Sequence, residues 1–428
     1  MGRSITVLPH IRKNSFGAWI FFITPAIKDA KMIQLISTSI MLILLILIIS
    51  LRFLDKAKKR NTGIFPSISF IIPCYNDADS VTETVDSIYG VVGKHADVVV
   101  IDDCSNDNSR EILEELQKVY RFTFAQNMRN IGKTATLNSH SHLARNKIIC
   151  FVDADVIVNK RSFVDALARL RGERVGAVSC PYASRNKGFL PLMQHIEYNM
   201  VSFIQGSYNL FSAIHLWGGF IVIKRKAFLD AGKFSLNAIT EDKDLAFKLN
   251  EKGWKVEQSP YPVESYAPDT CKDWVKQKIR WASGGAQCYF KHWKIWIRNP
   301  LHIIFLFSFC AFMTLSVVTR FEGIILWDHV VDYFKYLNGK LSLTASLKLI
   351  WLVYGAHILR DLLMKLTFTV FSLPFVLPLI RSFRRSFLLI LIVPFSVLYM
   401  PLFSLVSVAG IIYLLCNMRT LKVAERAW

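Results

Sequence analysis

The feature that most constrains this chain is an uncharged apolar stretch near its N-terminus, at positions 32–51 (MIQLISTSIMLILLILIISL). As a helix, a stretch of this length crosses the roughly 30 Å hydrocarbon core of a bilayer. It is too long for the apolar part of a signal peptide and lacks a small-residue cleavage site. Basic residues follow at once within 52–60, and such residues mark the cytosolic side of a membrane. We therefore expect one or more membrane segments within 1–60, with a shorter interfacial or re-entrant piece at 16–27.

The chain becomes apolar again after position 300. Positions 301–319 can form one span, whereas 346–380 is either one broken span or a span with a re-entrant piece. Charges inside a span are costly, so Arg360 and Asp361 either pair with each other at the end of a span or line a channel. We expect a transmembrane region at 300–428, in a multi-pass protein of the cell (inner) membrane.

Composition and charge agree with a membrane location. Hydrophobic residues make up 52% of the chain, and 52 Lys and Arg against 32 Asp and Glu give a net charge of +20. The excess cations lie beside the apolar stretches, which suits an anionic lipid surface better than nucleic acid. The expected partner is therefore a lipid bilayer, with no nucleic acid. Eight cysteines are scattered without metal-ligand spacing, as is typical of a reducing compartment.

The segment 61–262 has the composition of a soluble α/β domain. A capping box at Ser80 and Glu83 predicts the start of its first helix. Alternation of strand-like and helical runs predicts a mainly parallel sheet, with ligands beyond the carboxyl ends of its strands. The strand-like runs are 67–72, 97–101, 147–152 and 175–179.

Acidic residues follow two of the predicted strands. Asp102 and Asp103 either cap the next helix or hold the uracil and ribose of a nucleotide. Asp153 and Asp155 come after the third strand-like run, where strand alternation would place both carboxylates on the same side. Two such carboxylates beside a diphosphate supply hard oxygen ligands for Mg²⁺ or Mn²⁺.

Two later motifs admit a structural and a functional interpretation. The TED sequence at 240–242 is either an acidic helix start or a catalytic element. The QKIRW sequence at 277–281 lies on a helix rich in Lys and Trp, which also suits the surface of a membrane. We expect interface helices over 263–299, with 289–298 docking the domain on the bilayer.

In their order along the chain, the motifs IIPCYN, IDDCSND, NIGKTATLN, DAD, TED and QKIRW resemble those of the processive inverting glycosyltransferases of family 2. This group includes the synthases of poly-N-acetylglucosamine, chitin oligomers, hyaluronan and cellulose. The resemblance covers about 67–293 and extends to the layout of one domain between membrane segments. It implies an α/β domain of GT-A type, the nucleotide-diphospho-sugar transferase fold, joined to an α-helical transmembrane bundle.

The resemblance also implies a role for each matching residue. Asp242 matches the catalytic base, and Asp153 and Asp155 match the DxD motif that binds sugar and diphosphate through Mg²⁺ or Mn²⁺. Asn130 and Gly132 belong to the stretch that closes over the nucleotide. The implied donor-binding residues are Pro73, Tyr75, Asn76, Asp102, Asp103, Lys133, Asp153, Gln277 and Arg280. The implied acceptor-binding residues are Gly218, Gly219, Glu241 and Trp281, with a plain turn as the alternative role of the two glycines.

Elementary chemistry fits the same residues. The acceptor hydroxyl needs a positioned carboxylate to take its proton, and the departing UDP develops negative charge that a cation and Arg280 would neutralise. An aromatic face such as Trp281 can stack on a sugar ring and still let it slide. Direct displacement on an α-linked UDP-sugar by one base gives a β-linkage with inversion, unlike a retaining pair of carboxylates.

The expected function is polymerisation of a β-linked polysaccharide, of the poly-N-acetylglucosamine type, from a cytosolic UDP-sugar. The expected partners are the UDP-sugar, the growing polysaccharide and a small accessory membrane subunit, with export of the polymer as a further expectation. One alternative is the addition of a single sugar to a membrane lipid, as in ceramide glucosyltransferases. The non-enzymatic alternative is a transporter, or a scaffold that only senses nucleotide.

Overall fold

The computed structural model describes residues 67–93, 96–210, 212, 215–297 and 394–417, together with Ser50 and Leu391. Three predicted parts lie outside these residues: the N-terminal membrane segment apart from Ser50, the linker at 61–66, and most of the predicted membrane region 300–428, namely 300–390, 392–393 and 418–428, which includes Arg360 and Asp361. Within the described part, one helix is long and apolar enough to cross a membrane by length and composition, α14 (Met400–Asn417).

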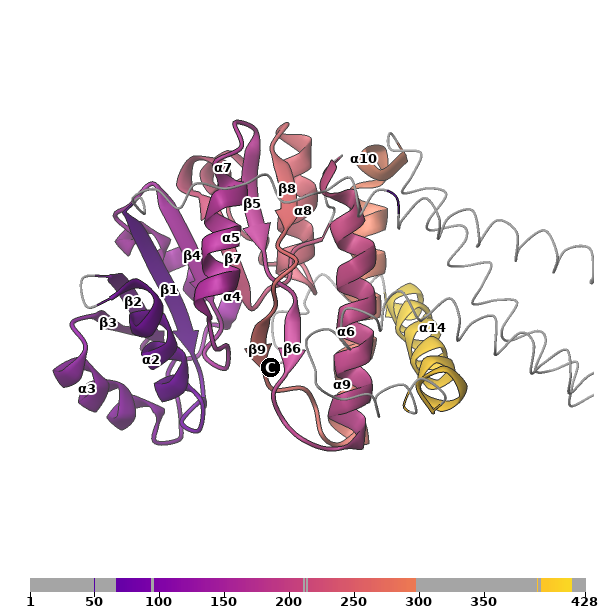
Figure 1. The fold of residues 1–428 in the computed structure, drawn as a ribbon, viewed down its shortest axis with the longest axis horizontal. Coiled ribbons are helices and arrows are strands. Elements are labelled where there is room, and N and C mark those ends of the chain that lie inside the picture. The colour runs from indigo at the N-terminus through magenta and orange to yellow at the C-terminus, as the bar shows by residue number, and fades with distance from the viewer. Residues whose placement is uncertain are drawn as a thin grey trace, which may run out of the picture.

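A seven-stranded sheet forms the centre of the α/β domain (Figure 1). Its strand order is β3-β2-β1-β4-β7-β5-β8, and neighbours are parallel except for β7, which is antiparallel to both β4 and β5. The sheet is therefore mainly parallel, as predicted, and the four predicted strands correspond to β1, β2, β4 and β5. The strands are β1 (Ile68–Cys74), β2 (Asp97–Asp102), β3 (Thr123–Gln126), β4 (Ile148–Val152), β5 (Val175–Ser179), β7 (Phe220–Lys224) and β8 (Lys255–Gln258).

Helices cover both faces of the sheet, which explains why its central strands are apolar throughout. All seven residues of β1 are buried. Phe70 and Ile72 belong to one core and Ile71 to the other, as the two-residue period of a strand requires. The first layer contains α2 (Val81–Val92), α3 (Ser109–Val119) and α5 (Lys160–Leu170). The second contains α4 (Lys133–His140), α7 (Arg225–Asp230) and α8 (Glu241–Glu251).

A small second sheet and two long helices lie beside the central sheet (Figure 1). Thr270 caps the longer of these two helices, α9 (Cys271–Lys291), by accepting a hydrogen bond from the Asp273 N–H at 3.1 Å. The helical part of the predicted interface segment therefore begins after β9, and α14 packs along it. These elements are β6 (Tyr182–Ser184), α6 (Phe189–Ser207), β9 (Val263–Ser265), α9 (Cys271–Lys291), α10 (Trp293–Ile297) and the short η3 (Phe395–Tyr399).

The predicted capping box is wrong. The helix α2 begins after Ser80 as expected, but the Ser80 hydroxyl donates to the Asp77 carbonyl at 3.4 Å and caps no N–H of the helix. Glu83 forms an ion pair with Arg185 instead. This partner comes from a segment far along the chain, so a local motif could not anticipate it.

Candidate functional site

The turn that follows β4 places Asp153 and Asp155 at the carboxyl end of the central sheet. Both residues lie in the turn and not in the strand, so the prediction that strand alternation aligns them is wrong. The Asp153 N–H donates to the Gly219 carbonyl at 3.0 Å, which fixes this turn beside the start of β7. Burial and the charge of Asp153 raise the pKa of Asp155 to about 6.

Lys133, the first residue of α4, reaches this pair of carboxylates. Its Nζ forms an ion pair with Asp153 and lies 3.8 Å from Oε1 of Glu241. Burial alone would lower the pKa of Lys133, but Asp153 and Glu241 raise it overall. Gly132 precedes the helix at φ +84°, a left-handed conformation that glycine adopts without strain. The lysine is therefore held charged between two acidic motifs that are far apart in the sequence.

Asp242, the predicted catalytic base, is the second residue of α8 and faces the same end of the sheet. Burial and the neighbouring Glu241 raise its pKa to about 7, although Lys133 and Arg280 act in the opposite direction. Gly218 approaches it so closely that a Cβ at position 218 would lie 2.9 Å from Oδ2 of Asp242. A carboxyl group whose pKa lies near neutrality is suited to accept a proton at physiological pH.

Gly219 is required by the close approach of Tyr182. A Cβ at this position would lie 2.5 Å from Cε1 of the Tyr182 ring, and the Gly219 N–H donates to the Tyr182 hydroxyl at 2.5 Å. Neither Gly218 nor Gly219 has a left-handed φ. Close packing against Asp242 and Tyr182, rather than turn conformation, therefore accounts for both glycines.

Asp103 organises the loop that leads into α4. Its carboxylate accepts hydrogen bonds from the N–H groups of Ile131 at 3.0 Å and Gly132 at 2.8 Å, and from the Asn127 side chain at 2.7 Å. The exposed Asn130 lies within the same loop. Asp103 thus links the end of β2 to the helix that presents Lys133.

Asp102 is fully buried and accepts hydrogen bonds from the Ser105 hydroxyl at 2.5 Å and the Gln126 side chain at 3.1 Å. The cap position of α3 is Asn108, which is five or more residues beyond both aspartates. The structural alternative, in which Asp102 and Asp103 cap that helix, is therefore wrong.

The loop after β1 lies against the loop after β2. Pro73 belongs to the buried end of β1, and Tyr75 and Asn76 follow it. The Asn76 N–H donates to the Ser105 hydroxyl at 3.0 Å, and its side-chain oxygen accepts from the Asn106 N–H at 2.8 Å. Asn76 adopts a left-handed φ of 56°, which Asn tolerates better than most residues. The residues of the first two motifs are thus brought together.

The helix α9 brings the QKIRW residues to the same region. Arg280 is exposed, and its charge acts on both Asp153 and Asp242. Within the described residues, Oε1 of Gln277 is buried and has no hydrogen-bond partner, which is unusual unless a ligand supplies one. The Trp281 ring packs against Tyr198, with 6.0 Å between ring centroids.

Three further residues of this region were not predicted. Burial and the charges of Asp155 and Asp153 raise the pKa of Asp77 to about 6, in spite of the hydrogen bond from the Tyr75 N–H. Tyr182 lies in a short strand without a recognisable motif. Lys278 lies inside QKIRW, but its complete burial cannot be read from the sequence. Asp77 could have been predicted from the sequence, because it directly follows the IIPCYN motif.

The acidic turn fits a divalent cation whose coordination is completed by a bound diphosphate. Asp153 and Asp155 offer carboxylate oxygens, the donors that Mg²⁺ and Mn²⁺ prefer. The described part of the chain has no group of three His, Cys, Asp or Glu side chains that could hold a metal by itself. Mg²⁺ is commonly held by one or two carboxylates together with phosphate oxygens and water. Burial and the charge of Asp153 raise the pKa of Asp155, and a cation bound here would favour the ionised carboxylates against both effects.

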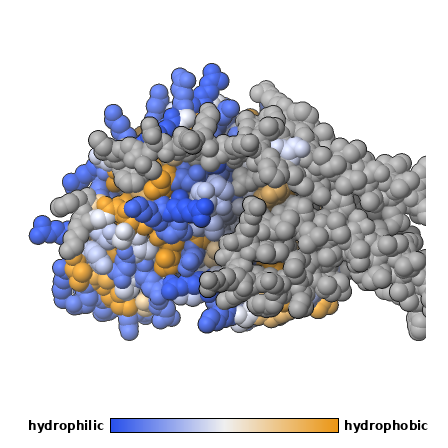
Figure 2. Space-filling view, viewed as in Figure 1, coloured by the Kyte–Doolittle hydropathy of each residue, from blue (hydrophilic) through white to orange (hydrophobic). Residues whose placement is uncertain are grey.

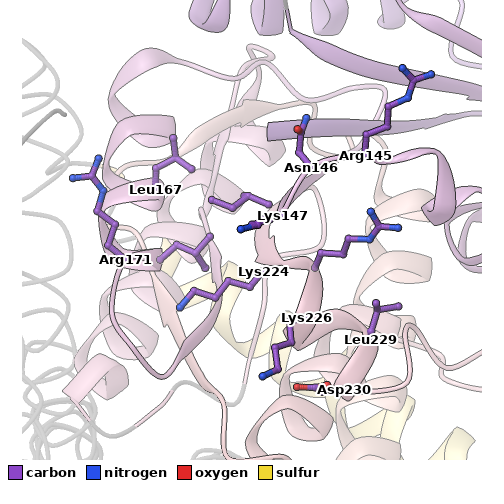
Figure 3. Close-up of a pocket in the computed structure, with 12 residues that line it drawn as sticks. Arg145, Asn146, Lys147, Leu167, Arg171, Lys224, Lys226, Leu229 and Asp230 are labelled. Carbon is purple, nitrogen blue, oxygen red and sulfur yellow. The ribbon is translucent and has the colours of Figure 1, made fainter. Parts of the chain in front are cut away.

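A separate basic cavity of about 870 Å³ lies at the opposite end of the central sheet (Figure 3). Ile148 begins β4 and pairs with Lys224, whereas the acidic turn follows the other end of β4. Figure 2 shows long hydrophilic side chains projecting from the upper edge of the domain, where Figure 1 places α7. The cavity is therefore distinct from the acidic site. Its basic lining residues are Arg145, Lys147, Arg171, Lys224, Arg225 and Lys226.

Comparison with known families shows what the α/β domain is similar to. Residues 69–231 match the model of the glycosyl transferase family 2. This part of the chain is similar to the family 2 glycosyltransferases. The matched range includes the turn with Asp153 and Asp155 and the start of α4, and it ends before Asp242 and α9. The α/β domain has the GT-A type fold that the motifs implied.

Two curated relatives to which this chain is similar are poly-beta-1,6-N-acetyl-D-glucosamine synthases. The chain is 26% identical over 278 residues to that of Staphylococcus aureus strain MSSA476, covering 63% of this chain and 68% of the relative. It is 27% identical over 285 residues to that of Staphylococcus epidermidis, covering 64% and 69%. Among solved structures, the mannosyltransferase PcManGT of Pyrobaculum calidifontis, in complex with GDP-Man and Mn²⁺, has a TM-score of 0.57. The two sequences are 17% identical, and the superposition covers 90% of this chain and 99% of that chain. At this identity the comparison shows a similar fold.

Proposed function

We propose that this chain is a family 2 glycosyltransferase that polymerises a β-linked polysaccharide of the poly-N-acetylglucosamine type from a UDP-sugar, with inversion at the sugar carbon. The observation that supports it most is the convergence of Asp242, Lys133 and Arg280 on one acidic site at the carboxyl end of the sheet. The names of the staphylococcal relatives support N-acetylglucosamine as the sugar.

In this proposal the donor binds against the loops after β1 and β2. Pro73, Tyr75, Asn76, Asp102 and Asp103 form the nucleotide side of the site. Asp102 and Asp103 already accept protein hydrogen bonds, so their contribution is largely to hold these loops in shape. The buried oxygen of Gln277 is available to a donor group of the ligand.

The diphosphate lies among charges of both signs. Lys133 and the exposed Arg280 offset the negative charge that develops as UDP leaves. Asp153 and Asp155 would hold Mg²⁺ or Mn²⁺, which when bound supplies further charge neutralisation at the diphosphate. Ser265 donates to Asp155 at 3.1 Å and orients its carboxylate.

Asp242 takes the proton from the acceptor hydroxyl as this oxygen attacks the sugar carbon. Glu241, Gly218 and Gly219 border the base, and Trp281 offers an aromatic face to the sugar that accepts the transfer. The bond from the acceptor oxygen to the anomeric carbon forms as the bond from that carbon to the UDP oxygen breaks, and this single displacement converts an α-linked donor into a β-linked product. Because ring stacking tolerates sliding, the product can advance by one unit after each transfer.

We also propose a membrane location with the catalytic domain, 61–262, in the cytosol. The apolar helix α14 packs directly on α9, and several of its side chains, among them Leu402, Leu405 and Ile412, are more than half exposed. The proposed membrane parts are 1–60 and 300–428, with interface helices in 263–299. A small accessory membrane subunit and export of the polymer belong to the same proposal.

The donor is identified by supplying the full chain, in lipid vesicles with Mg²⁺ or Mn²⁺, with one labelled nucleotide-sugar at a time. We expect UDP-N-acetylglucosamine to give at least about tenfold more product than UDP-glucose, UDP-glucuronate or GDP-mannose. Preferred use of GDP-mannose would overturn the assignment of the donor.

The Gly218→Ala substitution is expected to lower kcat by about 10- to 100-fold without loss of stability. The new Cβ would lie 2.9 Å from Oδ2 of Asp242, so the carboxylate must move out of its place. Rates at saturating donor and acceptor measure the effect. Gly90→Ala is the matched control, because Gly90 lies in α2 with open space around it. This control should raise the free energy of unfolding by up to about 1 kcal/mol and leave kcat unchanged.

The pH dependence of kcat/KM should follow the ionisation of Asp242. Burial and the charge of Glu241 raise its pKa to about 7, although the charges of Lys133 and Arg280 act to lower it. The buried Tyr182 also lies close enough to interact with its charge. Because a base must be unprotonated, kcat/KM should fall about tenfold per pH unit below pH 7 and reach a plateau above it. Rates measured at saturating metal between about pH 5.5 and 8.5 test this. A constant rate down to about pH 5.5 would argue against Asp242 as the base.

A further inference from the structure

A fully buried lysine lies one helical turn before Trp281 in α9. The Lys278 side chain is 0% exposed, and its Nζ lies 2.9 Å from Oε1 of Glu197 in α6. The same Nζ is 4.2 Å from the centre of the Trp281 ring and 5.0 Å from that of Tyr198. Burial lowers the pKa of Lys278, and Glu197 counteracts this shift. The ammonium thus contacts the faces of two aromatic rings next to the catalytic region.

The second oxygen of Glu197 connects this pair to the start of the apolar helix α14. The Tyr399 hydroxyl donates to Oε2 of Glu197, and it accepts a hydrogen bond from the Trp274 indole N–H at 2.8 Å. Tyr399 is the last residue of η3, immediately before α14. A continuous polar network therefore joins α6, α9 and the segment that leads into α14.

The helix α14 is also held against α9 beside Trp281. A Cβ on Gly410 would lie 2.9 Å from Cβ of Ala282 and 2.9 Å from the carbonyl oxygen of Ile279. The Ser283 hydroxyl donates to the Gly410 carbonyl at 2.8 Å. The two helices are thus in backbone contact next to the residue proposed to bind the acceptor, so a shift of α14 must displace this part of α9.

We propose that Lys278 is a positioning residue for the Trp281 ring, and that the network of Lys278, Glu197 and Tyr399 couples the placement of this ring to α14. A cation against the face of an aromatic ring restrains the ring. The part of the ring that the cation leaves uncovered is then held in a constant position for a sugar. In a polymerising enzyme, retention of the product after each addition sets product length. The inference rests on the proposed acceptor role of Trp281.

The first test removes the cation without leaving a buried charge. Lys278→Met alone would strand Glu197, and an unpaired buried charge is strongly destabilising. The Lys278→Met/Glu197→Gln double variant removes both charges at nearly the same volume. For it we expect the KM for N-acetylglucosamine oligomers to rise about fivefold and products to shorten by a similar factor. The KM for UDP-N-acetylglucosamine should change by less than about twofold, because the donor site is untouched.

The second test addresses the coupling to α14. Tyr399→Phe keeps the ring and the ion pair and removes the hydroxyl, which donates to Glu197 and accepts from the Trp274 indole. We expect products about twofold shorter, with the donor KM unchanged. Tyr120→Phe is the matched control and should leave product length unchanged, because Tyr120 stacks on Tyr89 beside the first layer of helices.

The outcomes separate this inference from the proposed function. If Trp281→Ala shortens products while the folded double variant does not, the positioning role of Lys278 is overturned. If Tyr399→Phe matches its control while the double variant shortens products, the coupling to α14 is overturned. If Trp281→Ala itself leaves acceptor KM and product length unchanged, the result contradicts the acceptor role of Trp281 in the proposed function.

Discussion

The Asp242→Asn variant is expected to transfer sugar about 10²- to 10⁴-fold more slowly than the parent chain while binding UDP with the same affinity. An amide has nearly the shape of the carboxylate and can still accept the hydrogen bond that the Lys243 N–H donates to Oδ1 at 2.7 Å. It cannot take a proton from the acceptor hydroxyl. Initial rates from labelled donor and UDP binding by calorimetry measure the two effects separately.

Asp244, in the same helix, provides a contrasting variant. It is fully buried and is held by Ser235, Lys291 and His292, whose hydrogen bonds lower its pKa in spite of burial. Asp244→Asn should lower the free energy of unfolding by roughly 1–3 kcal/mol and leave the rate per folded molecule nearly unchanged. Equal loss of rate in both variants, or loss of UDP binding in Asp242→Asn, would contradict the assignment of the base.

The Asp155→Asn variant is expected to reduce transfer by about 10²- to 10³-fold, because the negative charge that develops on UDP is then poorly neutralised. Unlike Asp242→Asn, this variant should also weaken donor binding and need more Mg²⁺ or Mn²⁺ for half-maximal rate. Metal titrations of the rate and of UDP binding measure this. Removal of divalent ions by a chelator should affect the parent chain in the same way.

The control for this variant is Asp230→Asn in the basic cavity at the other end of the sheet. Its carboxylate accepts a hydrogen bond from the Trp254 indole at 3.1 Å, a role that an amide oxygen can fill. The control should therefore keep the metal dependence of the parent chain. If Asp155→Asn transferred sugar normally at low metal, the proposed metal role of the DxD motif would be lost.

Four of the seven strands of the central sheet, β1, β2, β4 and β5, could be predicted because burial on both faces makes them largely apolar, whereas β3, β7 and β8 were not predicted. The order of the sheet could not, because β7 inserts antiparallel between β4 and β5, and no local pattern encodes the direction in which the chain returns. The capping box failed for a related reason. Glu83 has an alternative partner in Arg185, and local motifs take no account of competition from distant residues.

The motifs also located the residues that converge on the acidic site, because they mark places where strands end and helices begin. They did not show how those residues are held. Tyr182 packs against Gly219, and Glu197 pairs with Lys278, across elements that are separate in sequence. Such contacts depend on which helix faces meet, and hydrophobic periodicity gives the face of a helix but not its partner.

The size of the product tests the central proposal most directly. The full chain in lipid vesicles is supplied with labelled UDP-N-acetylglucosamine and Mg²⁺ or Mn²⁺, and the labelled product is separated by mass. The proposal predicts a high-mass, β-linked polymer that the Asp242→Asn variant fails to make. A lipid carrying one labelled sugar would contradict polymerisation, and label that stays in the nucleotide fraction would contradict transfer itself.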